Sequence, residues 1–280
     1  MVAVDSDGDL AISWTINPTL AFGWCWGNGY TGWIHGCFGG SSNITYVSIY
    51  NTSGSTLQWK GSGTTIRKLG PAPIEIPGGL LPQSGGGFLQ LSNTYSLTGG
   101  SSAVSAQPLS SHGQKVGTAW TATDPGGSPE TVSGISGAAA DANGNVAIVW
   151  QTLNGSDSPI YVRRYSANGT PLGNRITVAD RTNIQYYNCF FPIVEMAPSG
   201  MFIVLWGEDL GTFCGIKGQY FNTDGSPNGA AFTVTDTDYV TYYGPPAAAI
   251  DSTGNLTVVW EKTASVGLAS LLGRNITSPH

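Results

Sequence analysis

Charge is scarce in this chain. Only 10% of the 280 residues are Asp, Glu, Lys or Arg, and 17 acidic residues outnumber 11 basic ones, which gives a formal net charge of −6. Proteins that bind nucleic acids gather Lys and Arg against the phosphates. The only adjacent basic pairs are Arg67-Lys68 and Arg163-Arg164, so we expect no nucleic-acid partner.

Other absences narrow the function further. No apolar run approaches the length of a membrane-spanning helix, so we expect no membrane span. The four cysteines include no C-x-x-C pair, and the three histidines lie in unlike contexts. These features argue against zinc coordination and against Ser/His/Asp catalysis. We therefore expect no cofactor.

Glycine, in contrast, is abundant. The chain has 40 glycines without the every-third-residue period of collagen, which indicates many turns. Apolar and polar residues alternate between these turns, and this is the period of a half-buried β-strand. No segment shows a convincing helical period, so the sequence predicts an all-β fold.

One short segment recurs five times along the chain. In four copies, small or apolar residues lead to a turn that ends in Gly, and an alternating run closes on Trp six residues after that Gly. These copies span 2–14, 138–150, 193–206 and 247–260, and a degenerate fifth copy has Gly86 and Ser92 in the two roles. We interpret each copy as a β-hairpin, because Gly-centred turns accommodate a positive φ.

A second turn follows two of the tryptophans at a constant distance. Gly169 lies 19 residues after Trp150, and Gly225 lies 19 residues after Trp206. Each repeat therefore holds two hairpins, or four strands, in about 55 residues.

Five such repeats predict a β-propeller, in which four-stranded blades surround a central axis. We expect one domain over residues 1–280, with repeats at approximately 1–70, 71–136, 137–190, 191–244 and 245–280. A β-sandwich or a β-solenoid is the alternative. The repeated tryptophans should occupy equivalent positions on the second strand and pack between blades; they are Trp14, Trp150, Trp206 and Trp260.

The paired motifs read D-x-x-G-N-x-x-x-x-W and R-Y-x-x-x-G-x-P-x-G. They are carried by Asp141, Gly144, Asn145, Trp150, Arg164, Tyr165, Gly169, Pro171, Leu172 and Gly173. This pair resembles the extracellular propeller-type repeats of large secreted bacterial surface proteins. The likeness covers the third and fourth repeats well, the first and fifth partly and the second poorly. It implies the propeller fold and secretion, but no particular activity.

The fifth repeat is short of one strand. Its third strand should finish near Ile276, four residues before the last residue, His280. Propellers usually close by pairing strands from both termini, yet residues 2–4 are already assigned to the first hairpin. Three explanations stay open: the strands at the ends have a different register, flanking sequence is absent, or an open edge pairs with another chain. The closure of the ring and the oligomeric state therefore stay open.

The cysteines suggest two local disulfides. Cys25 and Cys37 bracket one insertion, and Cys189 and Cys214 flank one predicted hairpin. Of the three possible pairings, 25–37 with 189–214 is the local one. Disulfides persist in oxidising compartments, so we expect a secreted, extracellular or cell-surface protein. The alternative is four unpaired buried thiols.

Irregular, aromatic-rich segments gather on one predicted face, where the loops between second and third strands and between repeats lie. Rigid aromatic side chains can stack on sugar rings or anchor a protein partner. The alternative is a small satellite core that caps the propeller channel. The candidate ligand-binding residues are Trp24, Trp26, Tyr30, Trp33, Tyr186, Tyr187, Tyr242 and Tyr243.

A glycan-cleaving enzyme would need two carboxyl groups, one of them with a raised pKa. The same face offers several, and Glu208 and Asp209 are those that we would assign to catalysis. None of them lies in a recognisable motif, and Asp and Glu are ordinary loop residues. We therefore expect no catalytic residue.

Asp5, Asp7 and Asp9 place three carboxylates in one tight turn, which resembles calcium loops of some propellers. The distal bidentate Glu of a complete calcium loop is absent. The equivalent turns at 141–145 and 251–255 lose most of the charge. We interpret all three as plain turns, with calcium as the alternative.

Together these patterns favour a non-enzymatic, lectin-like module that binds carbohydrate or a partner protein. The first alternative is a structural or self-assembling surface protein. The second alternative is a glycan-cleaving enzyme.

Overall fold

The fold was analysed in a computed structural model, and its described residues form strands and turns, without a helix. They are 2–4, 10–16, 25–26, 36–37, 44–53, 56–62, 66–67, 74–95, 103–123, 131–132, 137–153, 157–180, 192–209, 214–235, 246–264 and 268–279. The chain divides into two compact units, Met1–Thr131 and Val132–His280. None of the described residues belongs to a helix long and apolar enough to span a membrane.

The first unit contains two larger antiparallel sheets and a two-stranded one. The first sheet has the order β1-β2-β5-β6, with β7 beside β5, and the second has the order β11-β10-β9-β8. Their strands are β1 (Val2–Val4), β2 (Leu10–Ile16), β5 (Ile44–Ser53), β6 (Thr56–Ser62), β7 (Ile66–Arg67), β8 (Ile74–Pro82), β9 (Phe88–Tyr95), β10 (Ala103–Leu109) and β11 (Trp120–Thr121). The small sheet pairs β3 (Cys25–Trp26) with β4 (Gly36–Cys37).

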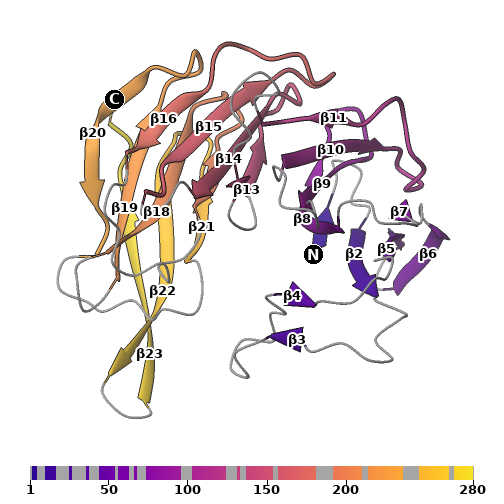
Figure 1. Cartoon of the computed structure of the whole chain (residues 1–280), viewed down its shortest axis with the longest axis horizontal. Coiled ribbons are helices and arrows are strands. Elements are labelled where there is room, and N and C mark those ends of the chain that lie inside the picture. The colour runs from indigo at the N-terminus through magenta and orange to yellow at the C-terminus, as the bar shows by residue number, and fades with distance from the viewer. Residues whose placement is uncertain are drawn as a thin grey trace. The chain divides into compact units, whose positions relative to one another are not determined.

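The second unit contains three sheets, drawn from magenta through orange to yellow in Figure 1. Their orders are β12-β14-β15-β16 with β13 beside β14, then β17-β18-β19-β20, then β21-β22-β23. The strands of the first are β12 (Thr131–Val132), β13 (Gly137–Ala140), β14 (Val146–Leu153), β15 (Ile160–Tyr165) and β16 (Ile176–Ala179). Those of the other two are β17 (Ile193–Met196), β18 (Phe202–Asp209), β19 (Cys214–Phe221), β20 (Pro227–Thr233), β21 (Ala247–Ile250), β22 (Leu256–Ala264) and β23 (Leu268–Ile276).

This topology confirms the all-β prediction and the hairpins of the five copies, which are β1–β2, β8–β9, β13–β14, β17–β18 and β21–β22. In the turns of the last three hairpins, φ is 81° at Gly144, 92° at Gly200 and 89° at Gly254. This left-handed region strongly favours glycine over residues with a side chain. The fixed spacing between Gly and Trp therefore reflects a turn of constant geometry.

Two of the repeated tryptophans, Trp206 and Trp260, lie between neighbouring sheets, as predicted. Trp206 packs in one cluster with Ala139, Val149 and Val162 of the preceding sheet, and it is 4% exposed. Trp260 packs in the same way against the β17–β20 sheet. Its cluster includes Ile203, Leu205, Ile216 and Tyr220. Burial of the large indole against the preceding sheet explains why Trp recurs at this position.

One strand of each of these three sheets lies next to its counterpart in the neighbouring sheet, with β17 in contact with both β13 and β21. The approach of β13 to β17 is close, because a Cβ added at Gly137 would lie 3.1 Å from the Cα of Ile193. The sequences of β13 and β21 are GAAA and AAAI. Such small residues allow β13, β17 and β21, which we call the inner strands, to approach one another.

Candidate functional site

Glu195 is the only ionisable residue of the three inner strands, β13, β17 and β21. It lies in the middle of β17, and its backbone is opposite Ile203 of β18. Its side chain is half-buried. The inner position on β17 therefore holds a carboxyl group where the two neighbouring strands offer only small or apolar side chains.

Burial raises the pKa of Glu195 from 4.5 to about 7. The cause is loss of hydration, which disfavours the charged form of a carboxyl group. No described residue forms an ion pair or a hydrogen bond with this side chain. A carboxyl group that keeps its proton near neutral pH can donate it, and such groups cluster at functional sites.

Sequence reasoning missed Glu195, although the repeats contain a signal for it. Glu195 lies five residues before the turn glycine, Gly200, and the corresponding residues of the other Trp-ending copies are Ala3, Ala139 and Ala249. One copy thus carries a carboxylate where three carry a methyl group. A departure of this kind within a structural repeat is the pattern that could have identified the residue.

Most of the predicted aromatic ligand-binding residues lie outside the described residues. They are Trp24, Tyr30, Trp33, Tyr186, Tyr187, Tyr242 and Tyr243. Trp26 belongs to β3, where its backbone lies opposite Gly36 of β4. The proposed binding face therefore stays a prediction from the sequence.

The cysteines are described in part. Cys25 and Cys37 lie directly opposite each other in the β3–β4 pair, the arrangement that a cross-strand disulfide would need. Cys214 begins β19, opposite Asp209 at the end of β18. Cys189 lies outside the described residues.

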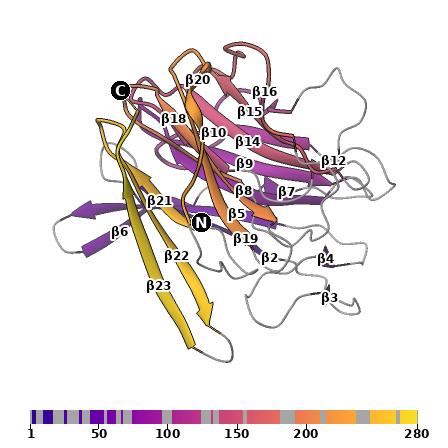
Figure 2. The ribbon, with the colours of Figure 1, turned by 90° about the vertical axis from the view of Figure 1, so that its left-hand side faces the viewer.

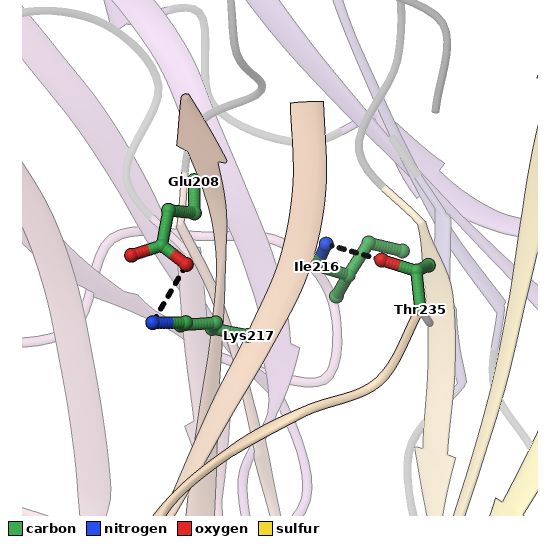
Figure 3. Close-up of polar contacts among 4 residues, drawn as sticks. All are labelled: Glu208, Ile216, Lys217 and Thr235. Atoms are coloured by element: carbon green, nitrogen blue, oxygen red, sulfur yellow. Dashed lines mark hydrogen bonds and ion pairs between the residues drawn. The ribbon is translucent and has the colours of Figure 1, made fainter. Parts of the chain in front are cut away.

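Glu208, one of the two carboxylates considered for catalysis, is engaged with a cation. Its Oε2 lies 2.7 Å from the Nζ of Lys217 on the adjacent strand, as Figure 3 shows. Both side chains are about one third exposed, with values of 34% and 33%. At this exposure solvent screens the pair, which contributes little to stability.

Hydrogen bonds that involve side chains hold the strand ends in place at the same end of the sheets. The N–H of Ile216 donates a 2.9 Å hydrogen bond to the Oγ1 of Thr235 (Figure 3). In the preceding sheet, the side chain of Gln151 donates to the Oγ of Ser158, and both residues are buried. The loops that continue from these strands therefore begin from fixed points.

The turns at the opposite end use their aspartates internally. Oδ1 of Asp141 accepts hydrogen bonds of 2.8 Å from the N–H groups of Asn143 and Asn145. Oδ1 of Asp251 accepts equivalent bonds of 2.9 Å from Thr253 and Asn255. These contacts agree with the interpretation of both segments as plain turns.

The calcium alternative for Asp5, Asp7 and Asp9 lies outside the described residues. Among the residues that are described, no group of three or more His, Cys, Asp or Glu side chains could hold a metal ion.

Two hollows open near the same turns, and Arg164 lines both. Their volumes are about 260 and 290 Å³. Asp141 and Asn145 line the first, and Asp224 and Arg175 line the second. Hydrogen bonds from Ser226 lower the pKa of Asp224. These hollows hold hydrogen-bonding groups of both charges, and Glu195 lines neither of them.

No protein-family model and no curated protein sequence matches the chain. Three solved structures share parts of its fold. An endo-arabinase from Bacteroides thetaiotaomicron is 13% identical, with 84% of this chain and 89% of that chain covered and a TM-score of 0.43. A family GH32 β-fructofuranosidase from Bombyx mori is 9% identical, with coverage of 99% and 59% and a TM-score of 0.41. An α-L-arabinofuranosidase from Podospora anserina, in complex with cellotriose, is 9% identical, with coverage of 100% and 90% and a TM-score of 0.42.

All three are named as enzymes that act on glycosides. They contradict the expectation of a non-enzymatic binding module and agree better with the glycan-cleaving alternative.

Proposed function

We propose that the protein is a glycan-cleaving enzyme in which Glu195 is the general acid. The observation that supports this role is the position of Glu195 on an inner strand, where burial raises its pKa to about 7. Cleavage of a glycosidic bond requires a carboxylic acid that protonates the leaving oxygen. Glu195 retains such a proton close to neutral pH.

The reaction also requires an ionised carboxylate, as nucleophile or as base for water. Glu208 and Asp209 end β18, the strand that pairs with β17. Glu208 forms an ion pair with the ammonium group of Lys217. Neither fits this role beside Glu195, because they lie five and six residues along β18 from Ile203, the cross-strand partner of Glu195. That is about 16–20 Å along the strand, beyond the about 5–9.5 Å that separates the two carboxyl groups of a glycosidase. We therefore assign only the acid, Glu195. The separation of the two carboxyl groups in the working enzyme would determine retention or inversion at the anomeric carbon.

We further propose that the five larger sheets are the blades of one five-bladed propeller. Their number and their order along the chain support this arrangement. The aromatic residues of the loops, with Trp26 and Trp33 first, would then contact the sugar rings of the substrate. The two predicted disulfides and the resemblance of the repeats support secretion.

Release of reducing ends from a panel of neutral and acidic polysaccharides tests the activity. The Glu195→Gln variant should lose at least about 100-fold in kcat, the scale of general acid catalysis. The matched control is Glu261→Gln, because Glu261 is an exposed carboxylate of β22. Turnover that survives in Glu195→Gln would exclude Glu195 as the acid, and a panel without any product would overturn the proposed activity.

The pH dependence gives a second readout of the same role. Glu195 must be protonated to act as an acid, so kcat/KM should fall as pH rises above about 7. Trp26→Ala and Trp33→Ala should leave this fall of kcat/KM above about pH 7 unchanged. They should mainly raise KM, because they would remove substrate contacts. If an active Glu195→Gln variant showed the same fall of kcat/KM with rising pH, the fall would belong to another ionisable group.

A further inference from the structure

Among the described strands, the last sheet of the second unit leaves one edge of the long strand β23 without a neighbour. The sheet has three strands, and among the described strands β23 pairs with β22 alone. The pairing runs through nine residue pairs, from Leu256 opposite Ile276 to Ala264 opposite Leu268. The outer edge of β23 therefore presents a row of backbone N–H and C=O groups along nine residues.

Much of the hairpin formed by β22 and β23 extends beyond β21, the third strand of its sheet. β21 pairs only with Leu256–Val259 of β22, so the part from Trp260 onward is a two-stranded ribbon. Figure 2 shows the ribbon, in yellow, reaching past β21. Two strands alone are marginally stable in water, and a third strand along β23 would stabilise them.

The edge of β23 lacks the features that protect other edges. Register shifts interrupt the pairing of β6, β16 and β20, the outer strands of three other sheets. Bulges of this kind twist an edge and hinder further pairing. No shift interrupts the β22–β23 pair, and β23 has no proline. Its one charged residue, Arg274, donates an Nη1 hydrogen bond of 2.8 Å to the carbonyl oxygen of Val234.

Leu271 marks the exposed side of the strand. It is 77% exposed, whereas Leu272 and Ile276 pack against the core shared with the preceding sheet. Exposed apolar residues are common singly on protein surfaces. In the middle of an unprotected edge strand, however, a leucine is a ready contact for an added strand.

We propose that β23 pairs antiparallel with β23 of a second copy of this chain, forming a symmetric dimer through one continuous sheet. The described residues contain no spare strand for this edge, since each of their strands already belongs to a sheet. Two-fold pairing needs a self-complementary strand. With Leu272 opposite its own copy, Leu271 lies opposite Gly273 and Arg274 opposite Ser270, so no like charges meet.

Sedimentation velocity on the full chain tests the dimer over a concentration range of about 1 to 100 μM. The protein should pass from monomer to dimer within this range. Leu271→Lys should raise the dissociation constant at least about tenfold, because lysine on an edge strand opposes pairing. Val116→Lys is the matched control, since Val116 is also an exposed apolar residue, 50% exposed, but belongs to the first unit.

A charge swap tests the geometry. In the proposed register the two copies of residue 271 are diagonal neighbours on one face, about 7–8 Å apart. Leu271→Lys and Leu271→Glu should each be monomeric alone, and an equimolar mixture should recover the dimer. Near-UV circular dichroism verifies that both variants are folded.

Three results would overturn the proposal. They are a wild-type chain that stays monomeric at the highest concentration, a dimer that Leu271→Lys leaves intact, and a mixture of the two variants that stays monomeric. None of these measurements depends on turnover. Failure of the dimer proposal is therefore distinguishable from failure of the proposed enzymatic activity.

Discussion

The hydroxyl of Tyr220 donates a 3.1 Å hydrogen bond to the carbonyl oxygen of Gly254. Tyr220 lies on β19 and is 1% exposed, whereas Gly254 lies in the turn between β21 and β22. The bond therefore joins two successive sheets of the second unit. Burial, and then the charge of Asp251, raise the pKa of Tyr220 to about 12, so the hydroxyl remains a donor over the whole physiological range.

Tyr220→Phe should lower the free energy of unfolding by about 1–2 kcal/mol, because it leaves the Gly254 carbonyl without its partner. Urea denaturation of both proteins measures the difference. The control is Thr257→Val, which removes an exposed 2.9 Å hydrogen bond to Asn275 and should change stability by less than about 0.5 kcal/mol. Equal effects of the two substitutions would contradict a special role for the buried bond.

The raised pKa of Glu195 also makes stability depend on pH. Below pH 4.5 both the folded and the unfolded chain hold the proton, and between 4.5 and about 7 only the folded chain holds it. The free energy of unfolding should therefore fall as pH rises through this window, by at most about 3 kcal/mol, and this contribution should stay constant above it.

Glu195→Gln should remove this contribution, so the variant should gain stability over the wild type at pH 8 but not at pH 4. Thermal unfolding of the two proteins at both values is the measurement, with Glu261→Gln as the exposed control. An identical pH dependence of wild type and Glu195→Gln would show that Glu195 titrates normally.

Gly218 accommodates two large cross-strand partners. Its backbone lies opposite Leu205 on one side and Phe232 on the other. A Cβ at this position would lie 2.9 Å from Leu205 Cδ2 and 3.0 Å from Phe232 Cζ. Gly218→Ala should destabilise the fold by about 1–3 kcal/mol, as expected for overpacking.

Gly273→Ala is the matched control for this prediction, since Gly273 also lies in a strand. Its added Cβ would be 3.4 Å from the nearest atom, the carbonyl oxygen of Val258, which is an ordinary contact. Denaturation at low protein concentration should show little loss. A larger loss for Gly273→Ala than for Gly218→Ala would contradict the packing described for β19.

The register of β3 and β4 predicts a disulfide between Cys25 and Cys37. Peptide mapping without reductant should recover the two cysteines in one linked fragment, together with a second fragment that links Cys189 and Cys214. A disulfide that closes a loop of this size stabilises by about 3 kcal/mol. Recovery of all four cysteines as free thiols from protein prepared under oxidising conditions would contradict both pairs.

Much of the fold could be predicted because it depends on local geometry. A turn that needs φ near 90° at Gly200 requires glycine whatever surrounds it. Trp206 and Trp260 were also predictable, because a large apolar residue at a fixed place in a repeat has one use, burial against the neighbouring sheet. The same reasoning identified the hairpins of all five copies.

The site was less predictable, because its chemistry arises between segments. The pKa of Glu195 depends on loss of hydration among strands that are about 50 residues apart in sequence, and no local pattern contains that information. Glu208 was found from its place in a loop-rich region, but its ion pair with Lys217 depends on the register of β18 and β19.

The position of the repeated tryptophans has a consequence for how the chain is made. Trp206 and Trp260 each pack against the sheet of the repeat before their own. A ribosome releases the earlier repeat first, and domains tend to fold in the order of their synthesis. Trp206 and then Trp260 therefore each meet a sheet that is already complete, and assembly of the second unit can advance from one sheet to the next while translation continues.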